Sequence, residues 1–332
     1  MFKFIEVCAG AGGLSSGFIK SGLVPELLND VDKNCCKTLE MNHAGVKVIC
    51  KSMLNLESDL TEYKNIPLLC GGVPCQSYSQ SGLRKGLDDP RGDLLLRFLE
   101  LVEKLEPKMF LIENVKGLIT HNKGETFKTI VTKMESRNYT ISYKVLNSND
   151  YDVPQKRERI IIVGLNKAFL KTEGYLFQFP SPMEKRLVLK DVLVDVPLSP
   201  CAKYSQIKID LFKQIGQGKC WTALSLEEQK KYLGKSYESG GGKRGILYRL
   251  SMEKPSLTLL CSPSQKQTER CHPLDERPLS IREYARIQTF SDDYEFTGSI
   301  ASQYKQIGNA VPVMMAYHLG IQIKKTFENE LN

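Results

Sequence analysis

The sequence predicts an α/β fold: a doubly wound, mostly parallel sheet with a second, smaller, loop-rich domain. In the first half of the 332-residue chain, short apolar runs alternate with amphipathic segments. Strands that alternate with helices form parallel sheets covered on both faces. From about residue 170 the regular patterning gives way to prolines, glycines and polar residues, and it returns at about residue 277.

The expected strands are runs rich in apolar residues, bounded by turn signals or by helical segments. They cover residues 2–7, 24–30, 46–50, 66–72, 108–115, 139–147 and 158–164. Apolar residues at helical spacing predict helices over 14–22, 32–42, 92–106 (closed by Pro107), 280–290 and 310–327. We therefore expect a discontinuous large domain, 1–170 and 277–332, with residues 171–276 inserted as the small domain.

Composition excludes several classes of protein. Hydrophobic residues make up 41% and charged residues 25% of the chain, which is ordinary for a soluble globular protein. No apolar run approaches the 18 residues of a membrane span, and the N-terminus carries no secretion signal, so we expect a cytoplasmic protein. The ten cysteines lack a framework spacing and are expected to be reduced, and no metal site is expected.

The positive charge is concentrated in one segment. Residues 171–274 hold 17 Lys and Arg against 10 Asp and Glu, a net +7, whereas the rest of the chain holds 29 against 28, a net +1. Such a segment suits a polyanionic partner. Charge alone is equally compatible with a solvated basic face.

A glycine loop separates the first strand from the first helix. Gly10, Gly12 and Gly13 would let a ligand approach the backbone, and Asp30 follows at the end of the second strand. A carboxylate there can accept hydrogen bonds from ribose hydroxyls, so an adenosine-containing cofactor is expected. A plain tight turn is the alternative, and G-x-G-G differs from the G-x-G-x-x-G typical of NAD-dependent dehydrogenases.

Reactive side chains follow neighbouring strands. Cys75 lies in GGVPCQSYSQSG just beyond one strand, and Glu113 lies in ENV at the end of the next. Arg157 and Arg159 begin another strand. A thiol, an acid and a cation suit attack on an unsaturated ring, with proton donation to the ring and binding of its oxygen. Taken singly, a cysteine is more often a buried, inert residue.

Taken in order, these motifs closely resemble those of the C5-cytosine DNA methyltransferase family, of the bacterial restriction–modification type. The order is the glycine loop, PCQ, ENV, QxRxR, a basic variable region, RPLSIREYARIQTF and GNAVP, covering residues 3–165 and about 277–320. The resemblance implies a Rossmann-like, S-adenosylmethionine-dependent methyltransferase fold. It also implies that residues 171–276 form a target recognition domain.

The resemblance also implies a mechanism. Cys75 would attack C6 of a cytosine flipped out of the duplex, and Glu113 would hydrogen-bond its N3 and exocyclic amine. Arg159 would bind the base's O2, and Arg157 would support the same pocket. C5 would take the methyl group of S-adenosylmethionine, leaving S-adenosylhomocysteine, and loss of the C5 proton would release the thiol.

Further positions match the family's binding residues. Those matched to the cofactor site are Cys8, Ala9, Gly10, Ala11, Gly12, Gly13, Asp30, Val31, Ser52, Met53, Pro74, Leu94, Asn309 and Ala310. Those expected to contact DNA are Ser81 and Arg91 in the loop 77–93, and Lys243, Arg244, Gln265 and Lys266 in the basic segment.

Three positions depart from the family pattern. Cys8 stands where relatives often carry an aromatic residue, and Val31 replaces a bulkier neighbour of the acid. Ser52 stands where an Asp is usual, which removes a hydrogen bond to the adenine amine. We therefore expect weak cofactor binding.

Three other functions explain these motifs less well. A tRNA cytosine methyltransferase would share them, but the expected Cys-Phe-Thr is only echoed by Cys220-Trp221-Thr222. An inactive binding protein would have lost Cys75, Glu113 or Arg159, and a dehydrogenase leaves PCQ and GNAVP unexplained. The expected partner is double-stranded DNA. A cognate restriction endonuclease would act in the same system without binding the chain, and we expect a monomer without regulatory domains.

Overall fold

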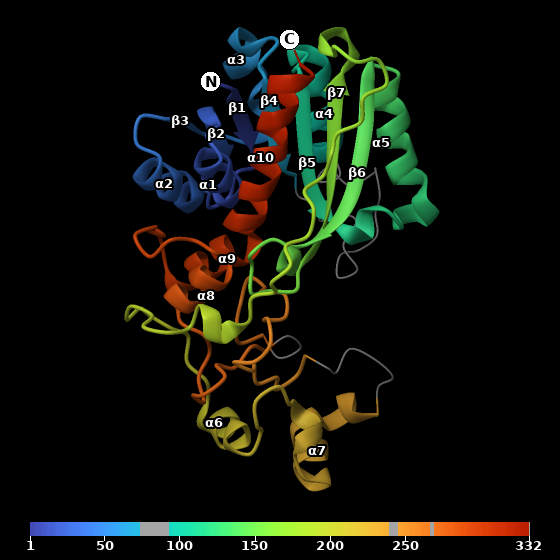
Figure 1. The fold of residues 1–332 in the computed structure, drawn as a ribbon. Coiled ribbons are helices and arrows are strands. Elements are labelled where there is room, and N and C mark those ends of the chain that lie inside the picture. Colours follow the sequence, from blue (N-terminus) through green and yellow to red (C-terminus); the bar gives the residue numbers. More distant parts are fainter. Residues whose placement is uncertain (74–92, 239–244, 266–268, 332) are drawn as a thin grey trace. The chain divides into compact units, whose positions relative to one another are not determined.

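The computed structural model describes residues 1–73, 93–238, 245–265 and 269–331 (Figure 1). The chain divides into two compact units. The first comprises Met1–Tyr151, Glu158–Met183 and Ala310–Asn332, and the second comprises Asp152–Arg157 and Glu184–Asn309. The two compact units do not report on function. The predicted division into a catalytic domain and a target recognition domain, at residues 170 and 277, therefore stays a prediction.

A seven-stranded sheet forms the centre of the first unit, as the sequence predicts. Its strands are β1 (Lys3–Val7), β2 (Val24–Asp30), β3 (Lys47–Cys50), β4 (Leu68–Gly72), β5 (Met109–Val115), β6 (Tyr139–Asn147) and β7 (Glu158–Asn166). The spatial order is β3-β2-β1-β4-β5-β7-β6, and only β7 runs antiparallel to its neighbours. The doubly wound, mostly parallel architecture is confirmed.

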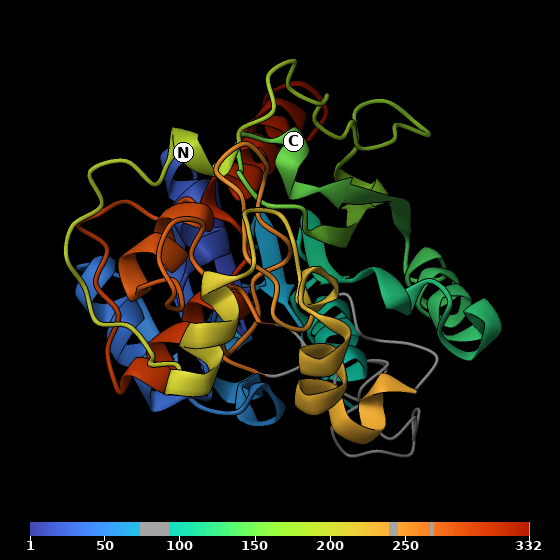
Figure 2. The ribbon, with the colours of Figure 1, turned by 90° about the horizontal axis from the view of Figure 1, so that it is seen from below.

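Helices cover both faces of this sheet because successive side chains of each strand point to opposite faces. On β1, Phe4 packs edge-on against Phe18 of α1 (Gly13–Lys20), which lies beside α10 (Val313–Asn329). Ile5 faces the other way, into a core shared with α4 (Asp93–Leu105) and α5 (Glu125–Glu135). In Figure 2, α10 (red) and α4 (teal) lie on opposite sides of the strands.

Several helix predictions need correction. The helix expected from residue 310 begins at Val313, because Pro312 occupies its N-cap. The helix expected over 280–290 is α8 (Ile281–Ile287), and it ends before Thr289, whose φ of 63° is left-handed. Among the described residues, five α-helices were not predicted: α3 (Glu57–Leu60), α5, α6 (Gln206–Lys213), α7 (Leu226–Leu233) and α9 (Ile300–Asn309). The helix expected over 32–42 is α2 (Lys33–Asn42).

The second unit has a small core of its own. Tyr204 and Phe212 stack with their ring centroids 5.2 Å apart, beside α6 and α7. Buried Arg249 donates to the carbonyl of Phe212 at 2.6 Å and pairs with Glu276 at 2.8 Å. Hydrogen bonds from a charged group are stronger than those between neutral groups. Arg249 therefore helps to hold the loop segments of this unit together.

Candidate active site

The carboxylate of Glu113 lies against the end of β4. Gly72 and Glu113 are partners in the parallel β4–β5 ladder. A Cβ atom built on Gly72 would lie 3.4 Å from Oε2 of Glu113, so the glycine leaves room for this side chain beside the backbone. Glu113 is only 7% exposed. An acid is therefore placed beside a residue that comes three positions before Cys75 in the chain.

A cation from the neighbouring strand accompanies this acid. Arg159 is the second residue of β7, where it is the ladder partner of Val115. Its Nε lies 3.0 Å from Oε1 of Glu113. This Oε1 is buried without a partner at hydrogen-bonding angles, so the contact is one of charge. The carboxylate keeps hydrogen-bonding capacity for another group.

Asn114 holds the backbone just after the end of β4. Its amide Nδ2 donates to the carbonyl of Val73 at 3.0 Å, and its Oδ1 accepts from the backbone N–H of Val115 at 2.8 Å. Asn114 is buried. Although this residue belongs to the ENV motif, the sequence alone predicted no role for it. A buried side-chain bond from one strand end to the next is not visible in sequence spacing.

Seven of the predicted positions lie outside the described residues. They are Pro74, Cys75, Ser81, Arg91, Lys243, Arg244 and Lys266. The chain enters the first of these segments at Val73, which Asn114 and the end of β4 hold in place.

The glycine loop closes on the predicted ribose acid. The backbone N–H of Gly10 donates to Oδ2 of Asp30 at 2.8 Å, and that of Asp32 donates to Oδ1, also at 2.8 Å. Burial raises the pKa of Asp30, and these hydrogen bonds oppose the rise. Gly10 adopts φ +57°, and a Cβ built there meets nothing within 4 Å. The loop therefore presents open backbone of the kind a ligand can approach.

The GNAVP segment (residues 308–312) meets this loop. A Cβ atom on Gly13 would lie 2.1 Å from the carbonyl oxygen of Val311 and 3.1 Å from Cβ of Ala310. Only glycine fits this approach. The structure therefore brings predicted cofactor residues 10–13 and Ala310 together.

The other predicted cofactor residues differ in exposure. Val31, beside Asp30, is 69% exposed, an apolar surface open to a ring. Cys8 is half-buried, and burial raises its pKa to about 12. The hydroxyl of Ser52 accepts from the N–H of Leu54, capping a short helix. Of the rest, Ala9, Ala11 and Met53 are buried, and Leu94 packs half-buried against the core.

Arg157 is committed to the backbone. Its guanidinium donates to the carbonyls of Gly308 at 3.0 Å, Asn309 at 3.2 Å and Leu259 at 3.4 Å. The side chain is 2% exposed. These bonds hold the GNAVP segment and suit a positioning residue. Asn309 also accepts, at its Oδ1, from the exposed thiol of Cys261 at 3.0 Å.

Two buried polar residues near the loop were not identified from the sequence. Asn29 of β2 donates from Nδ2 to the carbonyls of Ile49 and Lys51, each at 2.8 Å, and so holds the chain beside Ser52. Glu6 of β1 is 1% exposed, and burial raises its pKa to about 8, against hydrogen bonds from Ser15 of α1. A polar residue inside an apolar strand pattern is the signal that could have found both.

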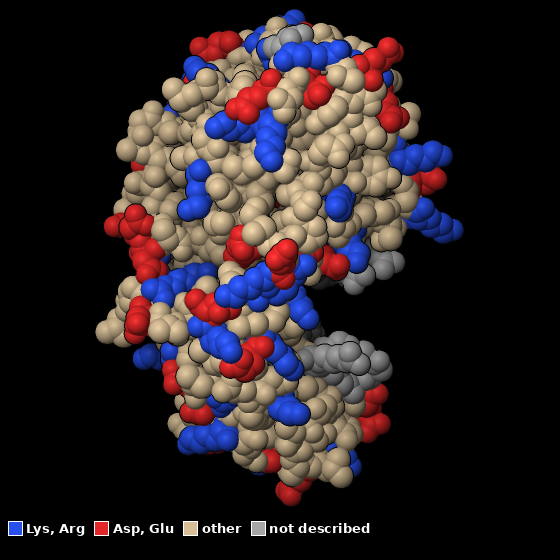
Figure 3. All heavy atoms as spheres, viewed as in Figure 1, with Lys and Arg blue, Asp and Glu red and all other residues tan. Residues whose placement is uncertain are grey.

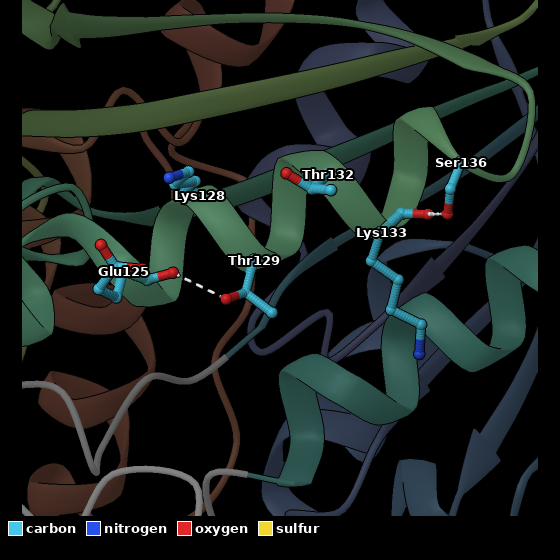
Figure 4. Close-up of a pocket in the computed structure, with 6 residues that line it drawn as sticks. All are labelled: Glu125, Lys128, Thr129, Thr132, Lys133 and Ser136. Atoms are coloured by element: carbon cyan, nitrogen blue, oxygen red, sulfur yellow. Dashed lines mark hydrogen bonds between the residues drawn. The ribbon is translucent and has the colours of Figure 1, made fainter.

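A shallow hollow on α5 offers no comparable chemistry (Figure 4). It is lined by Glu125, Lys128, Thr129, Thr132, Lys133 and Ser136. Thr129 donates to the carbonyl of Glu125 and Ser136 to that of Lys133, so these hydroxyls bond within the helix. Within the described ranges, no cluster of three metal-ligating side chains occurs. No helix there has the length and apolarity needed to cross a bilayer.

The fold and this geometry define a class. A sheet with one reversed strand, a glycine loop after β1 and an acid at the end of β2 are typical of α/β enzymes that bind an adenosine-containing cofactor at the carboxyl edge of their strands. The chain belongs to the C-5 cytosine-specific DNA methylase family, whose model matches residues 2–325.

Several type II methyltransferases are similar to this chain over most of its length. The chain is 45% identical to the type II methyltransferase M.Sau96I of Staphylococcus aureus, over 96% of this chain and 75% of that protein. It is 43% identical to M.Eco47II of Escherichia coli, over 96% and 78%. The structure of a Spodoptera frugiperda DNMT2 mutant shares the fold, with a TM-score of 0.70 at 13% identity, covering 98% of this chain and 100% of that one.

These findings confirm the predicted activity. The chain is a C5-cytosine DNA methyltransferase of the type II restriction–modification kind. The family and the fold imply that it uses S-adenosylmethionine, with DNA as substrate.

Proposed function

We propose that Cys75 is the nucleophile and that Glu113, Arg159 and Arg157 complete the catalytic site. The observation that carries the proposal is the position of Glu113, whose Oε2 lies against Gly72, three residues before Cys75. An acid fixed beside the segment that bears a thiol can bind the ring under attack.

The three charged residues have different tasks. Glu113 hydrogen-bonds N3 and the exocyclic amine of a flipped-out cytosine, which stabilises the ring while Cys75 attacks C6. Arg159 orients Glu113 through the 3.0 Å contact and offers its remaining N–H groups to O2 of the base. Arg157 positions the GNAVP segment through three backbone carbonyls. Loss of the C5 proton after methylation allows the thiol to leave.

The described cofactor residues fit S-adenosylmethionine, which supplies an electrophilic methyl group when bound. The open backbone at Gly10 accommodates the methionine portion, and Asp30 keeps lone pairs for ribose hydroxyls beyond its two backbone bonds. Exposed Val31 offers an apolar surface for the adenine. Ala310, beside Gly13, borders the same loop.

Residues 171–276 serve as the target recognition domain in this proposal. Their excess of Lys and Arg favours phosphate contacts, which make binding weaken with salt. On the face seen in Figure 3, the coloured Lys and Arg side chains of the second unit are interspersed with Asp and Glu. Gln265 is exposed and free to reach a base edge or a phosphate. The substrate is double-stranded DNA.

The proposal extends to the setting of the enzyme. A cytoplasmic monomer suffices, because each strand of the site is methylated in a separate event. The type II methyltransferase relatives support a restriction–modification setting. In this proposal a cognate endonuclease reads the same DNA without binding the chain.

The test measures transfer of labelled methyl from S-adenosylmethionine to unmethylated plasmid DNA and, separately, to bulk tRNA. Wild type is compared with Cys75→Ser and with Cys201→Ser, a half-buried cysteine outside the site. We expect label in DNA at one short motif, located by bisulfite sequencing, in wild type and Cys201→Ser only. Label confined to tRNA would overturn the substrate, and full activity of Cys75→Ser would overturn the nucleophile.

A further inference from the structure

Two cysteines lie next to Asp30, the predicted ribose-binding acid. Cys50 ends β3 and is the ladder partner of Asp30 at the end of β2. Cys36 lies near the start of α2, the helix that follows β2. The ladder and the short connection therefore bring two thiols from separate elements to one strand end.

Both thiols contact the backbone of the cofactor acid or its neighbour. Sγ of Cys36 lies 3.3 Å from the carbonyl oxygen of Asp30, and Sγ of Cys50 lies 4.0 Å from that of Val31. Burial and the neighbouring thiol of Cys50 raise the pKa of Cys36. Because the two thiols contact consecutive carbonyl groups, and Cys50 is the ladder partner of Asp30, both sulfur atoms lie at the same strand end.

The two thiols differ in access. Cys50 is exposed, whereas Cys36 is 3% exposed. An oxidant in solvent would therefore meet Cys50 first, with Cys36 behind it as the resolving thiol. No third metal-ligating side chain completes the pair among the described residues, which favours redox chemistry over metal binding.

We propose that Cys36 and Cys50 form a reversible disulfide under oxidation and that this bond lowers the affinity for the adenosine-containing cofactor. A peroxide oxidises the thiol of Cys50 to a sulfenic acid, releasing water. The sulfur of Cys36 then attacks the sulfenic sulfur, and a second water leaves as the disulfide forms. A dithiol reductant restores both thiols by exchange.

The coupling to the cofactor is local. A disulfide would take away the Sγ–H donor that Cys36 directs to the carbonyl of Asp30. It would also tie α2 to the end of β3, on either side of Asp30, whose carboxylate holds Gly10. This step rests on the proposed cofactor site.

The bond is tested first, without reference to activity. Protein treated with hydrogen peroxide is alkylated, digested with trypsin and mapped by mass spectrometry. We expect residues 34–37 linked to residues 48–51, with the link lost on dithiothreitol treatment. Because the first peptide also holds Cys35, the Cys35→Ser variant should keep the link, while Cys36→Ser and Cys50→Ser should lose it. No link in the wild type, or a link that survives in Cys50→Ser, would overturn the proposal.

The consequence is tested by calorimetric titration with S-adenosylmethionine. Oxidation should weaken binding by about fivefold or more in the wild type and leave Cys36→Ser unchanged, since a serine hydroxyl still donates to the carbonyl of Asp30. Equal affinity of the oxidised and reduced wild type would overturn the regulatory claim. Absence of binding by the reduced protein would instead contradict the proposed cofactor site, which separates the two failures.

Discussion

The guanidinium Nε of Arg159 lies 3.0 Å from the carboxylate Oε1 of Glu113, across the antiparallel pairing of β5 and β7. Both side chains belong to strands of the sheet, and both are largely buried. Their mutual position is therefore fixed by the sheet, as a preorganised site requires. Because β7 is antiparallel to β5, its first residues lie beside the carboxyl end of β5, where Glu113 is. In a parallel strand the first residues would lie at the opposite edge of the sheet.

Replacing Glu113 by Gln should lower kcat while sparing cofactor binding. Glutamine keeps the shape of the side chain but can no longer exchange a proton with the ring, and a positioned acid or base contributes roughly 10²- to 10⁴-fold. Single-turnover methyl transfer measures the loss, and titration calorimetry measures the cofactor. Glu158→Gln is the matched control, since that carboxylate pairs with the surface residue Lys116. Wild-type turnover by Glu113→Gln would contradict the role.

Asn114→Ala should reduce both stability and turnover. It leaves the carbonyl of Val73 without its side-chain donor in a buried position, and an unsatisfied buried group costs about 1–3 kcal/mol. The chain two residues before Cys75 would lose its anchor, so kcat should fall further than the change in folded fraction explains. Urea unfolding and kcat, measured at a temperature where the variant stays folded, separate the two effects.

Gly13→Ala should disrupt the junction between the glycine loop and the last helix. The added methyl would lie 2.1 Å from the carbonyl oxygen of Val311, and overpacking costs about 1–3 kcal/mol. Thermal unfolding and cofactor titration should both show a loss. Gly216→Ala is the control for the added methyl group alone, since a Cβ there meets nothing within 4 Å and its φ, like that of Gly13, is not left-handed. Equal cofactor affinity of the two variants would refute the junction.

Glu6 should make stability depend on pH. Burial raises the pKa of this carboxyl in the folded protein from 4.5 to about 8, so between these values the folded state holds a proton that the unfolded state has lost. The contribution of protonated Glu6 to the free energy of unfolding is therefore full below about pH 4.5, and it is lost as the pH rises to about 8. The full difference is at most about 5 kcal/mol, from 1.36 kcal/mol per pKa unit.

The matching variant is Glu6→Gln, which cannot titrate. Urea unfolding of the two proteins from pH 5 to 9 isolates Glu6, because other groups, such as His43 with its pKa lowered to about 4, contribute equally to both. The stability of the wild type relative to the variant should fall as the pH rises. A difference that stays constant with pH would show that Glu6 is not buried in this way.

Ser52→Asp should strengthen cofactor binding. The resemblance to the family predicts an acid that binds the adenine amine at the position of Ser52, and a hydrogen bond to a charged group contributes about 1.5–3 kcal/mol. Aspartate caps helices as well as serine does, so the short helix that Ser52 caps should persist. We expect a dissociation constant lower by roughly tenfold or more. A wild-type constant already well below micromolar would contradict weak binding.

Periodicity and motif order were enough to predict the sheet and the family. All seven strands were predicted because apolar runs bounded by turn residues leave few alternatives, and the motif order indicated the family. Helices α6 and α7 of the second unit were missed because they are short and cover a small core. The bonds from Asn114 to Val73 and from Arg157 to Gly308 depend on side chains meeting backbone across the fold, which spacing does not record.

The central claim is that Cys75 forms a covalent bond to cytosine, and capture of that bond tests it most directly. Fluorine at C5 cannot leave as a proton, so a DNA fragment amplified with 5-fluorocytosine should hold the enzyme after methyl transfer. We predict a denaturant-resistant complex that requires S-adenosylmethionine, with the nucleotide attached to Cys75 in peptide mapping and no complex from Cys75→Ser. Methylation of ordinary DNA without any such complex, or attachment at another residue, would contradict the account.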